Sequence, residues 1–416
     1  MTAFAFDRPW PRPASGCAVP YAVFTEQEVF AREQARIFRG PHWSFVGLAV
    51  EVPAPGDFKT TYVGAVPVIL LRDRDGELVV LENRCAHRGA LVCRELRGRQ
   101  SRLACVYHQW TYDLHGSLLG VPFRGGIEGR GGMPADFDPG EHSLVRLRVA
   151  CLHGLVFASF DDDVAPLEDY LGEMVVASIA RLCARPLKLL GDQRQFMRGN
   201  WKLYAENTRD PYHASLLHLF HTTFGLYRSS QQGATLMDPR HRHTMLYTKA
   251  ATSSATVDAE VYQDVRSYDT RFKLADPSLL AGRPEFEDGI TLVILSVFPN
   301  LVLQQIANTL AVRQLCPRDA ASFELVWTQF GYADDDAEMD AIRLKQANLI
   351  GPAGFVSMED GEAVEIVQRA VAEAGDAHSY VAMGGGRAED AAHLVTESAI
   401  IGFWEVWRAA MGVPES

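Results

Sequence analysis

Four residues near the start of the chain could together bind a metal cluster: Cys85, His87, Cys105 and His108. They are written as Cys-x-His, seventeen intervening residues, and Cys-x-x-His. Two thiolates and two imidazoles in this order are typical of a Rieske [2Fe–2S] cluster, in which two His replace two Cys on one iron. Neutral nitrogen in place of anionic sulfur raises the reduction potential of the cluster, which suits it to pass on single electrons.

A structural zinc site is the alternative for these four residues, because zinc also binds Cys₂His₂ sets. Zinc fingers usually pair Cys with Cys and His with His, whereas each short pair here mixes the two. The order of the ligands therefore favours the Rieske cluster. A cluster that relays electrons requires an acceptor, which directs attention to the rest of the chain.

A second metal-binding pattern lies further along, where Asp210, His213 and His218 are three and five positions apart. Positions three apart share a face of a helix and positions five apart do not. We therefore expect a wide, π-like turn between the two His, a distortion often found at functional sites. Two His and one carboxylate, with open positions opposite, form the metal site of non-haem Fe(II) oxygenases. Asp360 is the best candidate for the third ligand, and its alternative role is in a solvated acidic helix start.

Two other residues could serve this site. His221 follows His218 by three positions, and we expect it to be a structural or surface group. Arg313 lies in the apolar segment Leu310–Leu315, where a cation needs a ligand or an acidic partner. It is our candidate for binding a substrate carboxylate, since Arg offers a planar fork for that group. The alternatives are pairing with a protein carboxylate or extension of the side chain towards solvent.

The composition excludes several classes of protein. A net charge of -12 argues against a nucleic-acid partner, because phosphate binding needs a basic face. The sequence has no apolar run of about 18 residues and no signal-peptide pattern, so we expect no membrane span and a cytoplasmic location. Three of the seven Cys, Cys151, Cys183 and Cys316, lie in apolar surroundings and are expected to be buried thiols.

The pattern of apolar and turn-forming residues along the sequence predicts an α+β protein with three parts. Residues 1–40 form a helical segment that packs on the catalytic domain, residues 41–160 form an all-β Rieske domain, and residues 161–416 form a catalytic domain. Strands are expected at 290–298, 300–306, 309–315 and 321–332, and helices at 166–183, 337–350, 354–374 and 396–411.

Taken together, these motifs resemble the α subunit of Rieske non-haem iron ring-hydroxylating oxygenases over essentially the whole chain. The motifs are the two Cys/His pairs, the run Glu-Asn-x-x-Asp-x-x-His-x-x-x-x-His that ends at His218, and the segment Gly351-Pro-Ala-Gly-Phe before Asp360. The resemblance implies a Rieske β domain beside a helix-grip (START-like) domain, whose antiparallel sheet wraps a long helix. It also implies that Asp210 links an iron-ligand His to a cluster-ligand His of the neighbouring subunit.

The resemblance further implies the metal ligands and the reaction. Cys85, His87, Cys105 and His108 would hold the [2Fe–2S] cluster, and His213, His218 and Asp360 would hold mononuclear Fe(II). The chain would be the large subunit of a terminal oxygenase, an oxidoreductase of the EC 1.14 type that hydroxylates an aromatic ring with O₂. NADH would be oxidised on a separate reductase, with or without a ferredoxin, since the chain has no Gly-x-Gly-x-x-Gly unit. The assembly would be a homotrimer or, with a small β subunit, α₃β₃.

Long stretches resemble the aromatic-carboxylate branch of this family, which favours a substrate of the anthranilate, salicylate or benzoate type. The alternative is cis-dihydroxylation of the dicarboxylate terephthalate. That substrate would need a second cation near the Thr396-Glu397 helix start, where Arg387 is a few residues early and His393 is a weak substitute. Dioxygenation and monohydroxylation are both open. In another class, a Rieske electron carrier would need only residues 41–160, and a zinc-stabilised binding protein would hold no cluster.

Overall fold

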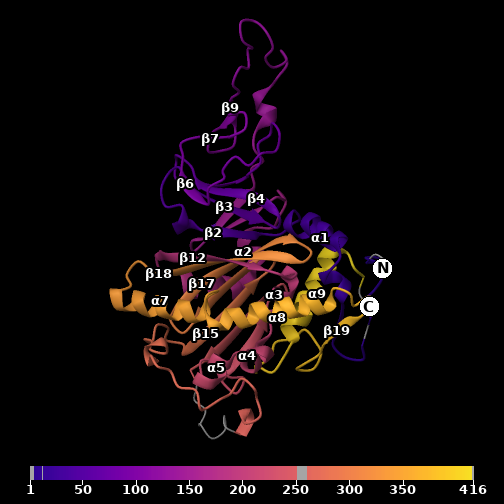
Figure 1. Cartoon of the computed structure of the whole chain (residues 1–416), viewed down its shortest axis with the longest axis vertical. Coiled ribbons are helices and arrows are strands. Elements are labelled where there is room, and N and C mark those ends of the chain that lie inside the picture. Colours follow the sequence, from indigo (N-terminus) through magenta and orange to yellow (C-terminus); the bar gives the residue numbers. More distant parts are fainter. Residues whose placement is uncertain (1–3, 12, 251–259, 415–416) are drawn as a thin grey trace. The chain divides into compact units, whose positions relative to one another are not determined.

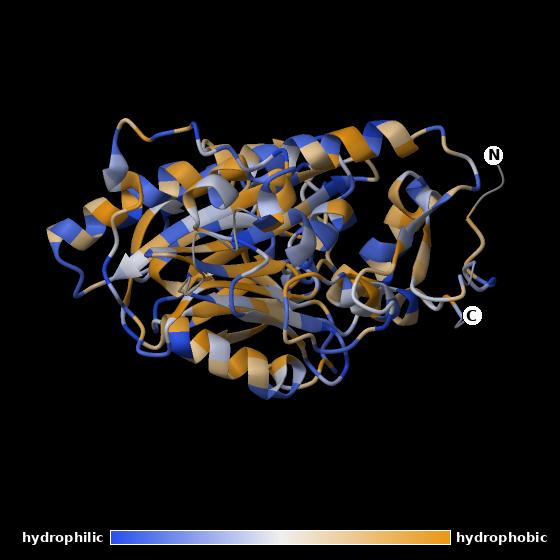
Figure 2. Cartoon of the chain, turned by 90° about the horizontal axis from the view of Figure 1, so that it is seen from below, coloured by the Kyte–Doolittle hydropathy of each residue, from blue (hydrophilic) through white to orange (hydrophobic). Residues whose placement is uncertain are grey.

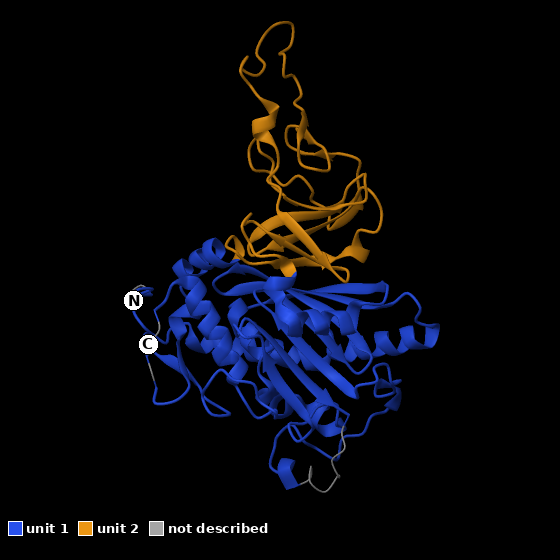
Figure 3. Ribbon diagram, turned by 180° about the vertical axis from the view of Figure 1, so that it is seen from behind, with its two compact units in different colours: residues 1–37, 168–416 blue, residues 38–167 orange. Residues whose placement is uncertain are grey.

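The chain forms two compact units, shown in Figure 3. The computed structural model describes residues 4–11, 13–250 and 260–414. Unit 1 combines Met1–Ile37 with Glu168–Ser416, and unit 2 is the continuous segment Phe38–Leu167. Unit 2 is therefore an insertion in the sequence of unit 1.

Unit 2 is built from small antiparallel sheets. Short strands joined by tight turns explain this all-β architecture, as in the turn between β4 and β5, where the Asp73 side chain accepts hydrogen bonds from the backbone N–H groups of Asp75 and Glu77. The sheets have the strand orders β10 (Arg148–Leu152), β11 (Leu155–Ser159), β2 (Ser44–Leu48); β5 (Leu78–Glu82), β4 (Val66–Arg72), β3 (Asp57–Val63), β6 (Arg97–Arg99); and β7 (Leu103–Ala104), β8 (Thr111–Tyr112), β9 (Leu118–Gly120).

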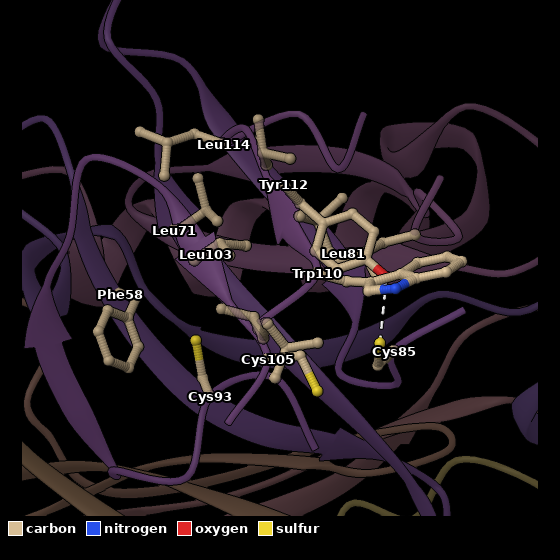
Figure 4. Close-up of a cluster of buried hydrophobic side chains, with 14 of the residues drawn as sticks. Phe58, Leu71, Leu81, Cys85, Cys93, Leu103, Cys105, Trp110, Tyr112 and Leu114 are labelled. Atoms are coloured by element: carbon tan, nitrogen blue, oxygen red, sulfur yellow. Dashed lines mark hydrogen bonds between the residues drawn. The ribbon is translucent and has the colours of Figure 1, made fainter. Parts of the chain in front are cut away.

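The hydrophobic core of unit 2 includes sulfur atoms among its apolar side chains (Figure 4). Cys85 and Cys105 are 3% and 2% exposed, and they pack in one cluster with Leu81, Trp110 and Tyr112. Burial of these side chains fixes the two cysteine-bearing loops against the sheets. The loops thus gain their position from the same core that stabilises the unit.

Unit 1 is organised around one antiparallel sheet of seven strands (Figure 1). The four strands of this sheet that come last in the sequence are neighbours in it and agree closely with the strands expected from the apolar segments between residues 290 and 332. In spatial order the strands are β12 (Leu187–Met197), β18 (Ser322–Tyr332), β17 (Thr309–Asp319), β16 (Leu301–Ile306), β15 (Ile290–Val297), β14 (His243–Lys249) and β13 (Gly233–Met237).

Helices pack on both faces of this sheet, and Figure 2 shows the largely hydrophobic strands between them. On one face lies α2 (Leu167–Cys183), where Arg181 donates to Gln305 of β16. The preceding residue of β16, Gln304, points to the opposite face because side chains alternate along a strand. That face is covered by α3 (Trp201–Asn207), α4 (Pro211–Leu217), α5 (Leu219–Phe224), α7 (Ala337–Ile350) and α8 (Phe355–Val371).

Two segments that lie far apart in the sequence are joined within unit 1. β1 (Cys17–Pro20) pairs antiparallel with β19 (His378–Val381). Glu33, at the end of α1 (Gln27–Glu33), is fully buried and accepts hydrogen bonds from Trp201 of α3 and Trp407 of α9 (Ser398–Met411). The buried ammonium of Lys202 pairs with the same carboxylate at 2.7 Å. The N-terminal segment is thus tied to the C-terminal helix through one buried carboxylate.

The burial of the cysteines and the length of the helices test two expectations from the sequence. Cys183 and Cys316 are buried, but Cys151 is exposed, so its assignment as a buried thiol was wrong. Cys151 lies on β10, which is an edge strand, and the apolar neighbours along the sequence point to the other face of that strand. Within the described residues, no helix is both long enough and apolar enough to cross a membrane.

Candidate functional site

The four cluster candidates lie on two loops of unit 2 with the same local geometry. Cys85 and His87 follow β5, and Cys105 and His108 lie between β7 and β8. Each loop is closed by a hydrogen bond to the carbonyl of its Cys, from the N–H of Gly89 in one loop and of Gln109 in the other, both at 2.9 Å. These two donors have positive φ angles of 74° and 57°. The left-handed turns bend each loop back on itself, so that its Cys and His face the same side.

The two imidazoles on these loops each leave one ring nitrogen without a partner among the described residues. The thiols of Cys85 and Cys105 are buried, and the imidazole rings of His87 and His108 approach to 4.5 Å between centroids. Nδ1 of each His is buried and has no hydrogen-bond partner within the described chain. A buried, unpaired ring nitrogen is costly unless something binds it. The pair of orphaned Nδ1 atoms therefore fits metal coordination.

Neighbouring aromatic groups hold these ligands in place. The indole of Trp110 stacks on His87, with ring centroids 4.6 Å apart and an interplanar angle of 6°. The hydroxyl of Tyr112 lies 3.2 Å from Sγ of Cys85, the contact drawn as a dashed line in Figure 4. Burial raises the pKa of Tyr112 well above its usual value, and the Cys85 contact adds to this. Tyr112 therefore stays protonated and can donate to the sulfur.

The spacing of the four donor atoms distinguishes a two-iron cluster from a single zinc ion. One tetrahedral zinc would hold sulfur and nitrogen at about 2.3 and 2.1 Å, and so within about 4 Å of one another. Among the described residues, no three of these four donors lie within 4.8 Å of each other. Donors that separate in this way suit two metal atoms, as in a [2Fe–2S] cluster. The zinc alternative does not fit this geometry.

The second set of candidates converges in unit 1. His213, His218 and Asp360 each place one ligand atom within 4.8 Å of the other two. Oδ1 of Asp360 lies 3.4 Å from Nε2 of His213 and 3.2 Å from Nε2 of His218. The two imidazoles come from the α4–α5 region and the carboxylate from α8, so the long separation in sequence is closed by helix packing. Two imidazoles and one carboxylate form the donor set expected for Fe(II).

Local breaks in the helices orient the side chains of His213 and His218. Asp210 begins α4 as its N-cap, and its Oδ1 accepts hydrogen bonds from the N–H groups of Tyr212 and His213. His218 has extended φ and ψ angles of -84° and 95° and separates α4 from α5. The expected π-like turn between the two His was therefore wrong. A break at His218, rather than a widened turn, rotates its ring towards His213.

The electrostatics of this site favour a bound cation. Burial opposes protonation of His213, but Asp210 and Asp360 outweigh it and raise the pKa of His213 to about 10. Burial opposes ionisation of Asp360, but His218 and His213 hold its pKa well below the usual range. The carboxylates thus supply negative charge that a metal ion at the three donors would balance, and this donor set fits iron.

Two residues to which the sequence analysis gave no role support the three donors. Asn207, at the end of α3, donates to Oδ1 of Asp360 at 3.0 Å and lies 3.3 Å from Nε2 of His213. Glu359 places Oε2 2.8 Å from Nδ1 of His218. From the sequence, Glu359 was only an acidic neighbour of Asp360 in a helix start. Its proximity to His218 depends on how α8 packs, which no local pattern reveals.

A small pocket adjoins the three donors. Its apolar walls come from strands and from α8: Leu246, Leu292, Ile294, Ile306 and Val356. Arg313, the one Arg or Lys among the described lining residues, enters it from β17. The free volume is about 60 Å³, smaller than the roughly 150 Å³ of an engineered cavity that binds benzene.

His221 also lines this pocket, so of its two expected roles, structural or surface group, the surface role was wrong. It is 3% exposed, and its ring lies 5.2 Å from that of His218 between centroids. Burial lowers the pKa of His221 to about 3, so the ring is neutral. Arg387 and His393, the two candidates for a second cation that binds substrate, do not line this pocket. Arg387 lines a cleft beside Trp10 and Cys17, and His393 is exposed.

The fold and both metal sites define a ring-hydroxylating oxygenase, and comparison with known families agrees. Residues 42–129 match the Rieske [2Fe-2S] domain, and residues 185–412 match the catalytic domain of the ring-hydroxylating α subunit. The chain belongs to the family of large subunits of Rieske non-haem iron ring-hydroxylating oxygenases. It is an oxidoreductase whose family uses a [2Fe–2S] cluster, Fe(II) and O₂. The catalytic domain excludes a simple electron carrier.

The relatives extend over nearly the whole chain. The large subunit of anthranilate 1,2-dioxygenase from Burkholderia cepacia is 50% identical, covering 95% of this chain and 94% of that protein. Subunit alpha 2 of a terephthalate 1,2-dioxygenase from Comamonas is 48% identical, with 96% of both covered. The large oxygenase component of salicylate 5-hydroxylase from Ralstonia is 43% identical, covering 98% and 97%. Naphthalene 1,2-dioxygenase from Rhodococcus shares the fold, with a TM-score of 0.78 at 24% identity and coverage of 95% and 94%.

Proposed function

We propose that this chain hydroxylates the ring of an aromatic monocarboxylate, using O₂ and electrons from an NAD(P)H-dependent reductase. The observation that carries the proposal is the buried guanidinium of Arg313 beside the iron ligands. An aromatic carboxylate would supply an apolar ring that suits the pocket walls. It would also supply a negatively charged partner for Arg313. Anthranilate, salicylate and benzoate belong to this class.

Arg313 is 6% exposed and is held by neutral groups. Its Nε donates to Oε1 of Gln304 at 2.7 Å, and its Nη1 donates to the hydroxyl of Tyr204 at 2.9 Å. The guanidinium also stacks over the ring of Trp327 at 4.3 Å. No carboxylate among the described residues forms an ion pair with it. An isolated buried charge is costly, so a ligand carboxylate would stabilise the guanidinium of Arg313 in the pocket.

A monocarboxylate is favoured over a dicarboxylate by the absence of a second cation among the described pocket residues. Arg387 lies in another cleft and His393 is exposed. The second carboxylate of terephthalate would therefore be buried without a charged partner, which is unfavourable. This argument supports anthranilate- or salicylate-like acids, even though a terephthalate-oxidising relative is similar over the whole chain.

We further propose the ligand assignments. Cys85, His87, Cys105 and His108 would hold the cluster, and His213, His218 and Asp360 would hold Fe(II), which supplies the activation of O₂ when bound. Asn207 orients the Asp360 carboxylate, and the apolar walls exclude water from the ring.

Electrons would reach the iron through Asp210. Its Oδ1 caps α4, while its Oδ2 faces Nδ1 of His213 at 3.3 Å. The same carboxylate would contact a cluster-ligand His of a neighbouring subunit in a homotrimer or an α₃β₃ assembly, fed by a reductase with or without a ferredoxin. Support comes from apolar side chains left exposed beside the cluster loops, Leu91, Val106 and Tyr107, which suit contact with a partner chain.

Product analysis with purified reductase tests the proposal. Anthranilate, salicylate, benzoate and terephthalate would be offered in turn, and the products would separate dihydroxylation from monohydroxylation. We expect Arg313→Gln to lower kcat/KM for the accepted acid by roughly 30-fold or more, because loss of a buried charge partner costs about 2–5 kcal/mol.

Arg318→Gln is the matched control, since Arg318 lies on the same strand outside the pocket and contacts Glu324. It should leave kcat/KM near the wild-type value. Turnover of the acids by Arg313→Gln at the wild-type rate, with iron retained, would contradict the role of Arg313. Hydroxylation of a neutral arene in preference to all four acids would contradict the substrate class.

A further inference from the structure

His221 is a polar group of the pocket, and its Nδ1 is buried without a hydrogen-bond partner among the described residues. Nδ1 of His213, by contrast, lies 3.3 Å from Asp210, and Nδ1 of His218 lies 2.8 Å from Glu359. Native structures rarely leave a buried ring nitrogen unpaired, and those that do occur often have a functional reason. An orphaned nitrogen in the wall of a ligand pocket is therefore placed to bind part of the ligand.

His221 is not a further ligand of the iron. The set of donors that converge within 4.8 Å contains His213, His218 and Asp360 but not His221. Its ring instead stands at 88° to that of His218, one turn further along in α5. The ring of Tyr227 lies 6.4 Å from that of His221 between centroids, and the Tyr227 hydroxyl already donates to the carbonyl of Pro211.

We infer that His221 selects substrates carrying a neutral hydrogen-bonding substituent, an amino or hydroxyl group, beside the ring carboxylate. The inference deepens the proposed function and rests on it: Arg313 takes the carboxylate, and His221 takes the second group. The ring nitrogens of an imidazole can donate or accept a hydrogen bond, so His221 can pair with either substituent. Benzoate would leave His221 unpaired.

Binding measured without turnover tests the inference. The Kd values of the iron-loaded, oxygen-free oxygenase for anthranilate, salicylate and benzoate would be measured by titration calorimetry. We expect the wild type to bind at least one substituted acid about tenfold or more tightly than benzoate. His221→Leu should bring that ratio close to one by weakening the substituted acid alone, and His221→Gln, which keeps a polar amide, should restore part of it.

Two controls identify other causes of a change. Ile306→Val removes one methylene from the same pocket and should shift the three Kd values together. Arg313→Gln should weaken all three acids, because it acts on the carboxylate that they share. Iron content, measured for each variant, shows whether the site has stayed intact.

The outcomes separate this inference from the proposed function. Wild-type binding of benzoate as tight as that of both substituted acids would overturn the role of His221, whether or not the variants fold. An unchanged ratio in His221→Leu with normal iron content would overturn it as well, while the substrate class would stand. Failure of the wild type to bind any of the three acids would overturn the substrate class, and the inference with it.

Discussion

At the scale of single residues, the contact between Glu359 and His218 has a measurable consequence. A carboxylate on the outer nitrogen of a metal-binding His fixes its tautomer and ring orientation. We expect Glu359→Gln to weaken iron binding roughly 10- to 100-fold, the usual cost of removing such a partner. Titration with a chelator, followed by the iron left in the protein, measures this directly.

Glu362→Gln is the control for this change, since Glu362 is an exposed residue of the same helix. Its iron should resist the chelator as the wild type does. If both variants keep iron equally well, Glu359 has no role at the metal.

Residue types and spacing predicted that His213, His218 and Asp360 would converge, but they did not predict what surrounds these side chains. His213, His218 and Asp360 could be found because ligand chemistry restricts the residue types that serve. Asn207, Glu359 and the pocket position of His221 could not, because amides, carboxylates and imidazoles are common in helices. Only the packing of α3, α5 and α8 brings these three side chains to the iron site.

At the scale of elements, the start of α4 combines a structural and an electronic role in Asp210. Asn is about as good an N-cap as Asp, so Asp210→Asn should preserve the helix. The amide lacks the charge that faces His213, and we expect turnover to fall roughly 100-fold while both metal sites stay loaded. Iron analysis and the spin-resonance signal of the cluster check the loading, and the rate of NADH-coupled hydroxylation checks the transfer.

Asp336→Asn offers a matched comparison, because Asp336 caps α7 through the N–H of Met339 in the same way. Its rate should remain near that of the wild type. A wild-type rate for Asp210→Asn would rule out the proposed electron path.

Regular elements were predicted well and irregular ones were not. The apolar strands between residues 290 and 332 and the helix from 337 to 350 follow simple periodicity, and α7 matches its expected limits. The break at His218 does not, because an extended residue between two short helices leaves no periodic signal. It is set by contacts such as that of the Thr222 hydroxyl with the carbonyl of Ser215.

At the scale of the whole molecule, unit 2 contains a buried ion pair that should control its acid stability. Glu51 is paired with Lys59 at 2.7 Å and with Arg97 at 2.8 Å. Burial alone would raise the pKa of Glu51, but Lys59 and its hydrogen bond lower it below the usual value. The stabilisation is therefore present at neutral pH and is lost as the pH falls below the range of an ordinary Glu, about 4.5.

A double-mutant cycle measures this contribution. Glu51→Leu should destabilise unit 2 by about 3–5 kcal/mol, because it leaves Lys59 buried and unpaired. The double variant Glu51→Leu, Lys59→Met should recover much of that loss and should show a weaker dependence on pH below 4.5. Loss of the cluster's absorbance on heating reports unfolding of unit 2. Equal acid sensitivity of wild type and double variant would contradict the assignment.

Metal content follows from the presence of both sites in one chain. We expect about three iron atoms per chain, two of them in the cluster. A mild chelator should remove the mononuclear iron first, stopping hydroxylation while the spin-resonance signal of the cluster persists. Fe(II) added back should restore activity, and a content of two irons in a fully active protein would contradict the two-site account.

The insertion of unit 2 within unit 1 sets an order for folding during synthesis. Phe38–Leu167 is continuous and leaves the ribosome early, so it can fold and receive its cluster while the chain is still growing. Unit 1 must wait, because β1 needs β19 as its partner and Glu33 needs Trp407, and both lie well after unit 2 in the sequence. A chain whose synthesis stops before α9 would then carry an assembled electron carrier on an unfinished oxygenase.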